Sequence, residues 1–462
     1  MKPPSSDQQP TLLAIAWPIF IEQTLRILIG TVDTFMVSHV SDGAVAALGV
    51  ANQFVVLALI CFNFIGIGAS VVITHHVGAG DRKGAEKIVT TAIAVNTWVG
   101  LLVGVIAISF TANLLRLMQL PETLMVYAQP FLFWMGATLF MEAMNTAIGA
   151  SLRAYGHTRD AMVVTVLQNV LNVALGSVLL FGWFGLHSFG VLGVAYASVI
   201  SRAASSIALW ILLDRRLHIM LRARDFVALQ QDRIKRILHI GLPAAGENLS
   251  YWLSLMVITS FAARLGARSL ATMTYTQNIQ RLVILFSISL GLGTEILIGR
   301  LIGAGQFEAA YREVIKSVRT GLMIAAAGML AIAASAPHLM GLFTKDPVII
   351  GAGVVLLYWA VLYEPGRVFN IVIINSLRAT GDARFPVQIA MISQWFCSVP
   401  LCWFVGVKLG HGLTGIWIAM LSEEWVRGLI MARRWKLRRW LKYAHKSRAQ
   451  VTGDVIPQAV EI

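Results

Sequence analysis

Charged residues are scarce in this 462-residue chain: Asp, Glu, Lys and Arg together make up 13% of it, about half the share of a typical soluble domain. A chain of this length could not cover its surface with so few charges, which excludes an ordinary soluble enzyme. Hydrophobic residues make up 57% of the chain, which excludes a disordered protein. Only three cysteines occur, all in apolar runs, so the sequence predicts no disulfide framework.

Several functional motifs are also missing from the sequence. The phosphate-binding loop Gly-x-x-x-x-Gly-Lys-Ser/Thr does not occur, so ATP is not expected to be the energy source in this chain. The sequence offers no cluster of metal ligands and no nucleophile motif. We therefore expect neither an enzyme nor a metal site, and no organic cofactor.

The chain does contain long apolar runs. A membrane-spanning helix needs about 20 mostly apolar residues, and the run 161–201 is too long for one span, so it divides at the glycine-rich turn 181–190. Twelve spans are predicted in this way, and six of them, the first, fourth, seventh, eighth, tenth and twelfth, carry one to three embedded charges. They lie within residues 11–38, 43–75, 88–115, 123–150, 161–201 (two spans), 236–263, 270–299, 320–344, 347–377, 385–407 and 411–432. The sequence therefore predicts an all-α membrane protein whose first span is retained.

The basic residues predict the orientation in the membrane. With both termini in the cytoplasm, the inner loops and tails hold 26 of the 37 Lys and Arg residues, and the outer loops hold 5. This bias follows the positive-inside rule and accounts for the net charge of +14 without any nucleic-acid partner. We expect a bacterial plasma-membrane protein whose basic tail, from residue 433, contacts anionic lipid headgroups.

The two halves of the chain repeat each other. Gly78-Ala-Gly80 recurs as Gly303-Ala-Gly305, and Ser151-Leu-Arg-Ala154 recurs as Ser376-Leu-Arg-Ala379, both after 225 residues. The same shift pairs Glu22 with Glu247. Each half then has six spans, an even number, so the halves are parallel repeats, as in transporters that bind substrate between two halves.

The repeat predicts a V-shaped two-lobe bundle. Its predicted parts are an amino-terminal lobe at 1–213, a cytoplasmic linker at 214–235, a carboxy-terminal lobe at 236–438 and a basic cytoplasmic tail at 439–462.

These motifs, in this order, resemble the multidrug and toxic compound extrusion (MATE) family over residues 11–440. The residues that carry the resemblance are Val32-Asp-Thr-Phe-Met-Val37, the two Gly-Ala-Gly motifs, Ser151–Gly156, Ser376–Asp382, Gly241-Leu-Pro243 and Glu364-Pro-Gly-Arg367. The resemblance implies export of organic, often cationic, compounds in exchange for H⁺ or Na⁺. One position departs from the family pattern: Asn172 matches an asparagine of the fifth span, but Gly176 occupies the place of its aspartate partner. This departure argues against an intact amino-lobe cation site.

Acidic side chains within spans are candidates for the transport site, because an ionisable group is costly there. Glu22, Glu364 and Glu423 each have an arginine three or four residues away, so each could form an ion pair along its own helix. Four acids have no basic residue at that spacing, and we expect them to bind a proton or a cationic substrate: Asp33, Glu142, Glu247 and Glu295.

The predicted site combines these acids with neighbouring polar and aromatic residues. For ion coupling or substrate we select Asp33, which is also a family position, together with Glu247, Glu364, Asn145, Asn169 and Asn172. Possible substrate contacts are Glu142, Glu295, Tyr251 and Trp252, the last two because an aromatic ring can stack on a flat cation.

The sequence favours a secondary active exporter, driven by H⁺ or Na⁺, that acts as a monomer on a small cationic or amphipathic substrate. Two other functions stay open. A lipid-linked glycan flippase of related architecture would need an arginine-rich cavity, and a membrane-embedded enzyme would need a catalytic motif.

Overall fold

The computed structural model describes residues 11–185 and 187–453, and almost all of them are helical. The predicted positions of both chain ends, and of the tail beyond residue 453, lie outside the described residues. Within the described part the helices are long and apolar, and no strand occurs. The prediction of an all-α membrane protein is confirmed.

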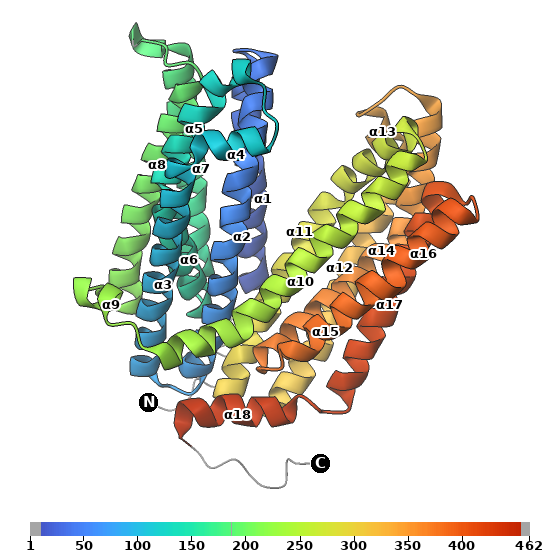
Figure 1. Ribbon diagram of the computed structural model, residues 1–462. Helices are drawn as coiled ribbons and strands as arrows, with labels where there is room; N and C mark the ends of the chain where they lie inside the picture. Colours follow the sequence, from blue (N-terminus) through green and yellow to red (C-terminus); the bar gives the residue numbers. More distant parts are fainter. Residues whose placement is uncertain (1–10, 186, 454–462) are drawn as a thin grey trace. The chain divides into compact units, whose positions relative to one another are not determined.

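The helices of the first half follow the predicted spans (Figure 1). They are α1 (Leu12–Ser38), α2 (Asp42–Gly78), α3 (Arg82–Ser109), α4 (Thr111–Leu117), α5 (Met125–Ala137), α6 (Leu139–Ala154), α7 (Thr158–Phe181), α8 (Val191–Leu212) and the short α9 (Ala223–Val227). The break predicted at 181–190 is present between α7 and α8. The segment 123–150, predicted as one helix, is instead two helices bent by 48° at Thr138.

The second half repeats this order. Its helices are α10 (Gln231–Arg264), α11 (Ala267–Gly303), α12 (Phe307–Ala334), α13 (Ala336–Gly341), α14 (Pro347–Ala379), α15 (Arg384–Ile392), α16 (Val399–Leu401), α17 (Gly412–Lys436) and α18 (Leu441–Thr452). Two π-helical segments, Ser393–Ser398 and Cys402–Lys408, join α15 and α16 to the end of their span.

Nine described helices are long and apolar enough to cross a membrane, and α5 with α6 makes a tenth span if the bent pair counts as one. The helices α10 and α17 have 34 and 25 residues but do not belong to this set. Both carry charged residues of the site described below, and charge lowers the hydropathy on which the assignment depends. The number of twelve spans therefore stays a prediction.

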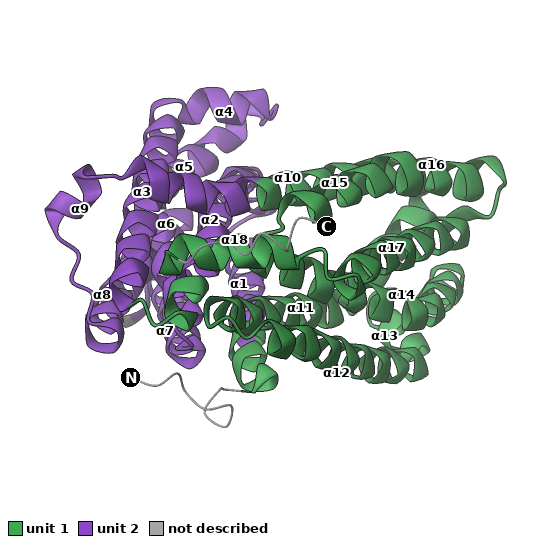
Figure 2. Cartoon of the chain, turned by 90° about the horizontal axis from the view of Figure 1, so that it is seen from below, with its two compact units in different colours: residues 1–20, 74–81, 243–462 green, residues 21–73, 82–242 purple. Residues whose placement is uncertain are grey.

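Two compact units are present, and the chain passes between them four times (Figure 2). Unit 1 comprises residues 1–20, 74–81 and 243–462, and unit 2 comprises residues 21–73 and 82–242. The start of α1 thus belongs to unit 1, whereas the start of α10 belongs to unit 2. The bounds of the units differ from those of the predicted lobes, because the units are defined by contacts and the lobes by the sequence repeat. The division into lobes stays a prediction.

Close glycine contacts fix the exchanged helix ends within each unit. In unit 2, a methyl group at Gly68 would collide with the carbonyl of Ile237 on α10. In unit 1, a methyl group at Gly293 would lie 3.4 Å from Leu12 and Ala16 on α1. Gly293 and Leu12 are the repeat equivalents of Gly68 and Ile237. Small residues let helix backbones approach closely in membranes, and here both halves use them at the same place.

A second exchanged contact joins the ends of α2 and α11 in unit 1. A methyl group at Gly78 would collide with the carbonyl of Arg300, and one at Gly303 would collide with the carbonyl of His75. The shift of 225 residues converts each of these contacts into the other. Such reciprocity is what a two-fold relation between like parts produces. The Gly-Ala-Gly motifs therefore mark a pseudo-symmetric backbone contact.

Candidate functional site

A chain of five charged side chains crosses the inside of unit 2. Glu22 on α1 lies 2.8 Å from Arg153 on α6 and 3.4 Å from Arg26 on α1. Arg26 lies 3.6 Å from Glu142, which in turn lies 3.1 Å from Arg202 on α8. We call this set the amino chain. It alternates in sign and has an arginine at each end, so it holds three positive charges against two negative ones.

Asp33 on α1 provides a further acid in the same unit. It makes no ion pair within 4 Å in the part of the chain that the structure describes, and its Oδ1 atom is buried without a hydrogen-bond partner there. The side chain is half-buried, and the Arg202 guanidinium lies within electrostatic range. Counted with Asp33, the charges of the amino chain balance. The absence of an ion-pair partner, predicted for Asp33 from spacing, holds within the described residues.

The amides predicted to support Asp33 bind elsewhere. The Asn172 amide nitrogen donates to the hydroxyls of Ser198 at 3.0 Å and Ser201 at 3.4 Å. The Asn145 amide donates to the carbonyl of Arg202 at 3.4 Å, and the Asn169 amide donates to a carbonyl of its own helix. In the described structure, these three amides therefore donate hydrogen bonds to groups other than Asp33.

A methionine fills the space beside Gly176. A Cβ atom at Gly176 would lie 2.9 Å from the Cε and 3.3 Å from the Sδ of Met36 on α1. The Sδ atom accepts a hydrogen bond from Ser177 at 3.7 Å. Where the family pattern has a carboxylate, this chain therefore has a thioether. Hard cations prefer oxygen ligands, and a thioether is a soft ligand.

A second chain of five charged side chains lies in unit 1. Arg367 on α14 lies 3.0 Å from Glu364 and 3.7 Å from Glu424 on α17. Arg427 lies 2.8 Å from Glu424 and 3.1 Å from Glu423. We call this set the carboxy chain. It also alternates in sign, but a glutamate stands at each end, so it holds three negative charges against two positive ones.

The repeat relates the two chains while reversing part of their charge. Arg202 and Arg427 are equivalent positions, and so are Glu142 and Arg367. Both units thus place a buried charged chain at the same point of the repeat. Where the amino chain has Glu142, the carboxy chain has Arg367, so the partners of Arg427 are instead two glutamates of its own helix α17, Glu423 and Glu424.

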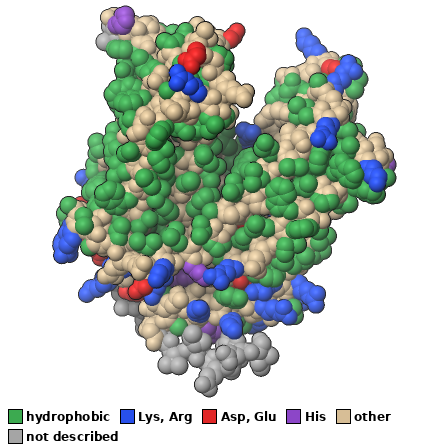
Figure 3. All heavy atoms as spheres, viewed as in Figure 1, with side chains coloured by type: hydrophobic (Ala, Val, Ile, Leu, Met, Phe, Trp, Pro, Cys, Tyr) green, Lys and Arg blue, Asp and Glu red, His purple; other side chains and the backbone are tan. Residues whose placement is uncertain are grey.

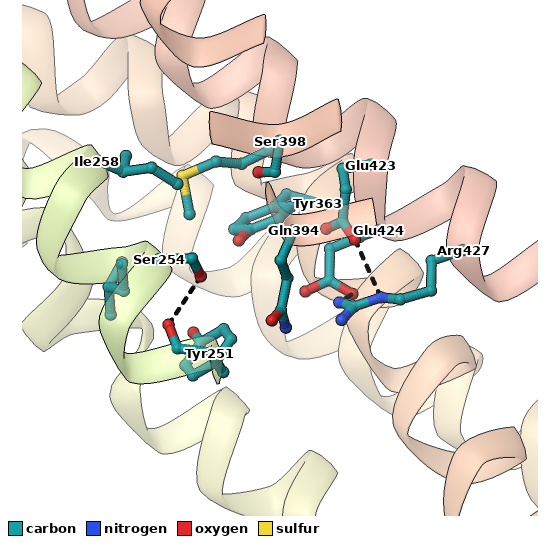
Figure 4. Close-up of a pocket in the computed structure, with 11 residues that line it drawn as sticks. Tyr251, Ser254, Ile258, Tyr363, Gln394, Ser398, Glu423, Glu424 and Arg427 are labelled. Carbon is teal, nitrogen blue, oxygen red and sulfur yellow. Dashed lines mark hydrogen bonds and ion pairs between the residues drawn. The ribbon is translucent and has the colours of Figure 1, made fainter. Parts of the chain in front are cut away.

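A cavity of about 20 Å³ lies beside the carboxy chain, large enough for one water molecule. In Figure 4 the side chains of Tyr251, Glu424 and Arg427 surround it, with Gln394 between them. The remaining lining residues are Ser254, Leu255, Ile258, Tyr363, Ser398, Met420 and Glu423. The Arg367 guanidinium lies 4.4 Å from the ring centroid of Tyr363 and donates a hydrogen bond to its hydroxyl. The cavity therefore has an aromatic wall and an acidic wall.

A third cluster lies nearer the end of α14. Arg378 lies 3.2 Å from Glu247 on α10 and 3.5 Å from Glu295 on α11. Glu247 and Arg378 are the repeat equivalents of Glu22 and Arg153. In the amino chain two arginines share Glu22, whereas here two glutamates share one arginine.

The structure adds tertiary partners to the acids selected by spacing. Glu142, Glu247 and Glu295 have no basic residue three or four positions away, but each pairs with an arginine from another helix. Spacing along one helix shows only local partners. Glu247 and Arg378 are 131 residues apart.

Of the two predicted aromatic contacts, only Tyr251 lines the cavity. The side chain of Trp252 is 57% exposed and lies outside the lining set. Sequence reasoning also missed Glu424, which lies next to Glu423 in α17. Two adjacent acids within a predicted span were the signal that could have identified it.

Comparisons with known proteins agree with this arrangement. The MatE family model matches residues 18–178 and again residues 243–404, the second match beginning 225 residues after the first. The "Uncharacterized transporter YisQ" of Bacillus subtilis is 41% identical, with 95% of this chain and 96% of that protein covered. The "Probable multidrug resistance protein NorM" of Thermotoga maritima is 26% identical, with 95% of each covered.

Solved structures share the fold. An outward-facing multidrug resistance MATE family transporter superposes with a TM-score of 0.83 at 22% identity, covering 92% of this chain and 95% of that one. At this identity the likeness concerns the fold alone.

Proposed function

We propose, from the premise that this chain belongs to the MatE family of membrane transporters, that it exports small organic cations in exchange for protons. The family relation makes it a transporter and not an enzyme. The coupling ion, the direction of exchange and the charge of the substrate are our proposals. These proposals rest on Asp33, a half-buried carboxylate that makes no ion pair within 4 Å among the described residues.

A proton fits the amino-terminal unit better than Na⁺ does. A sodium ion needs several oxygen ligands arranged around it, whereas a proton needs one carboxylate oxygen. The amide of Asn172 is bonded to two serines, and Met36, three residues after Asp33 on α1, fills the space at Gly176. The neutral form of a carboxyl group is favoured in low-dielectric surroundings. Asp33 can therefore gain and lose a proton without assembling a cation cage.

The carboxy chain suits a cationic substrate. Its three glutamates outnumber its two arginines, so it keeps one uncompensated negative charge. The aromatic rings of Tyr251 and Tyr363 line the adjoining cavity and offer faces to a flat cation. A cavity of about 20 Å³ is too small for a drug, so substrate entry requires the helices around it to separate.

Coupling then follows from differential affinity. If protonation of Asp33 and binding of the substrate each stabilise a different facing of the transporter, each ligand weakens the other. We extend the proposal to a monomer in the bacterial plasma membrane with both termini in the cytoplasm, as the basic residues predict.

Efflux from proteoliposomes under separate gradients tests the proposal. A pH gradient should drive efflux of a fluorescent organic cation, and a Na⁺ gradient alone should not. Asp33→Asn should abolish proton-driven efflux with little loss of stability, because the substitution nearly conserves volume. Asp42→Asn is the matched control, because Asp42 is an exposed acid at the start of α2. Efflux driven by Na⁺ alone, or normal proton coupling in Asp33→Asn, would refute it.

A further inference from the structure

The linker after α8 exposes large apolar side chains. Met220 is 69% exposed, Val227 is 80% exposed and Leu229 is 36% exposed. The tail of the second half behaves differently, because Trp440 and Ala444 are buried within unit 1. Exposing apolar side chains to water is unfavourable by about 25 cal/mol per Å². These side chains are available to contact lipid.

A hydrogen bond fixes the linker on the lipid-facing side of α3. The Nε1 atom of Trp98 donates to the carbonyl of Phe226 in α9 at 2.7 Å. Trp98 begins a stripe of exposed apolar residues that runs along one face of α3 through Leu101, Leu102, Val105 and Ile106. Residues 88–97, towards the start of α3, are buried or half-buried. Figure 1 shows α9 beside α3 and α8 at this level.

The exposed stripe starts at Trp98, ten residues into the predicted span 88–115, so the membrane–water boundary on α3 lies later in the helix than the sequence predicted. Tryptophan is enriched at such boundaries, and Trp98 is 49% exposed. The start of α3, with Arg82, Lys83 and Lys87, is predicted to be cytoplasmic. The linker is thus expected at the inner surface of the membrane.

Unpaired arginines accompany the exposed apolar residues. Arg215, Arg222 and Arg224 are exposed and make no ion pair within 4 Å in residues 11–185 and 187–453. The nearby acid Asp225 is engaged by the turn itself, since its carboxylate accepts the backbone N–H of Arg222 at 2.9 Å. Arg216 differs, because it pairs with Asp160 at 2.8 Å. Figure 3 shows basic side chains gathered along the lower part of the visible face.

We propose that this linker binds an anionic phospholipid of the inner leaflet. Arg222 and Arg224 bind the phosphate, because a guanidinium can donate two parallel hydrogen bonds to it. Met220 and Val227 contact the upper part of the acyl chains. The inference depends on the predicted cytoplasmic position of the linker, and it is independent of the coupling ion and the substrate.

Native mass spectrometry of the purified full-length protein tests the site. Phosphatidylglycerol and phosphatidylcholine are titrated separately. The wild type should bind phosphatidylglycerol more tightly than phosphatidylcholine. The double variant Arg222→Ala/Arg224→Ala should bind phosphatidylglycerol about 25-fold more weakly, because each basic side chain near an anionic surface contributes about fivefold. Val227→Ser should weaken binding of both lipids.

The control removes the same charge from another cytoplasmic element. Lys83 and Lys87 are exposed near the start of α3 and make no ion pair within 4 Å in the part of the chain described. The variant Lys83→Ala/Lys87→Ala should keep its affinity within about twofold. If the arginine double variant does not elute as a folded protein, Arg224→Gln replaces it, with an expected loss of about fivefold.

Three results would overturn the proposal. The first is equal affinity of the wild type for the two lipids, and the second is an equal loss in both double variants, which would indicate a general surface-charge effect. The third is unchanged lipid binding in the arginine variant together with loss of a co-purifying protein, which would make the linker a protein-docking segment.

Discussion

Replacing Gly78 with alanine places a methyl group against the carbonyl of Arg300, where the ends of α2 and α11 meet. The obstacle is backbone, which cannot rotate away, so one of the helix ends must shift. Overpacking of this kind costs about 1 to 3 kcal/mol. The repeat predicts a similar cost for Gly303→Ala, whose methyl group would meet the carbonyl of His75. The double variant should lose less than the sum, because one shift of α2 relieves both collisions.

Gly49→Ala is the matched control for Gly78→Ala. Gly49 lies in α2 as well, but nothing lies within 4 Å of the position of its Cβ atom. Alanine there should be neutral or stabilising by up to about 1 kcal/mol, the difference in helix propensity. The measurement is the apparent Tm of the purified protein in detergent, by tryptophan fluorescence at a fixed heating rate. Gly78→Ala and Gly303→Ala should each lower it by a few degrees. Equal Tm values for Gly78→Ala and Gly49→Ala, or opposite shifts for Gly78→Ala and Gly303→Ala, would refute the reciprocal contact.

The repeat also supplies a comparison of two arginines. Arg378→Gln leaves the buried Glu295 and the half-buried Glu247 without their shared guanidinium and should destabilise by about 3 to 5 kcal/mol. Arg153→Gln leaves Glu22 paired with Arg26 and should cost clearly less. Urea unfolding of both variants in detergent decides this, and equal losses would contradict the charge count. Gly176→Asp should destabilise alone, because it places a carboxylate at a buried position against the Met36 thioether, whereas Gly176→Asp with Met36→Ala should gain Na⁺-stimulated efflux. A double variant that is stable but still insensitive to Na⁺ would show that Met36 and Gly176 do not set the ion preference.

The sequence was sufficient to predict the all-α membrane fold and the internal repeat. Each depends on residues that are close along the chain, or on a motif that recurs at one spacing. A run of apolar residues must bury its backbone polar groups in a helix to enter lipid, whatever its neighbours are. The family match at residues 18–178 and 243–404 agrees with the repeat predicted from Gly78-Ala-Gly80 and Gly303-Ala-Gly305. The bend at Thr138 was missed, because the flanking residues read as one apolar run.

The pairing of the charges was decided by the tertiary structure. Spacing identified the local pair of Glu364 and Arg367, which are on one turn of α14. It could not identify Arg378 as the partner of Glu247, because the two residues are 131 positions apart and meet only when α10 packs beside α14. The same limit hid the excess of acid in the carboxy chain and the excess of base in the amino chain. The sequence alone sets which charges enter the membrane; helix packing sets which of them neutralise one another, because ion pairing requires atoms within about 4 Å.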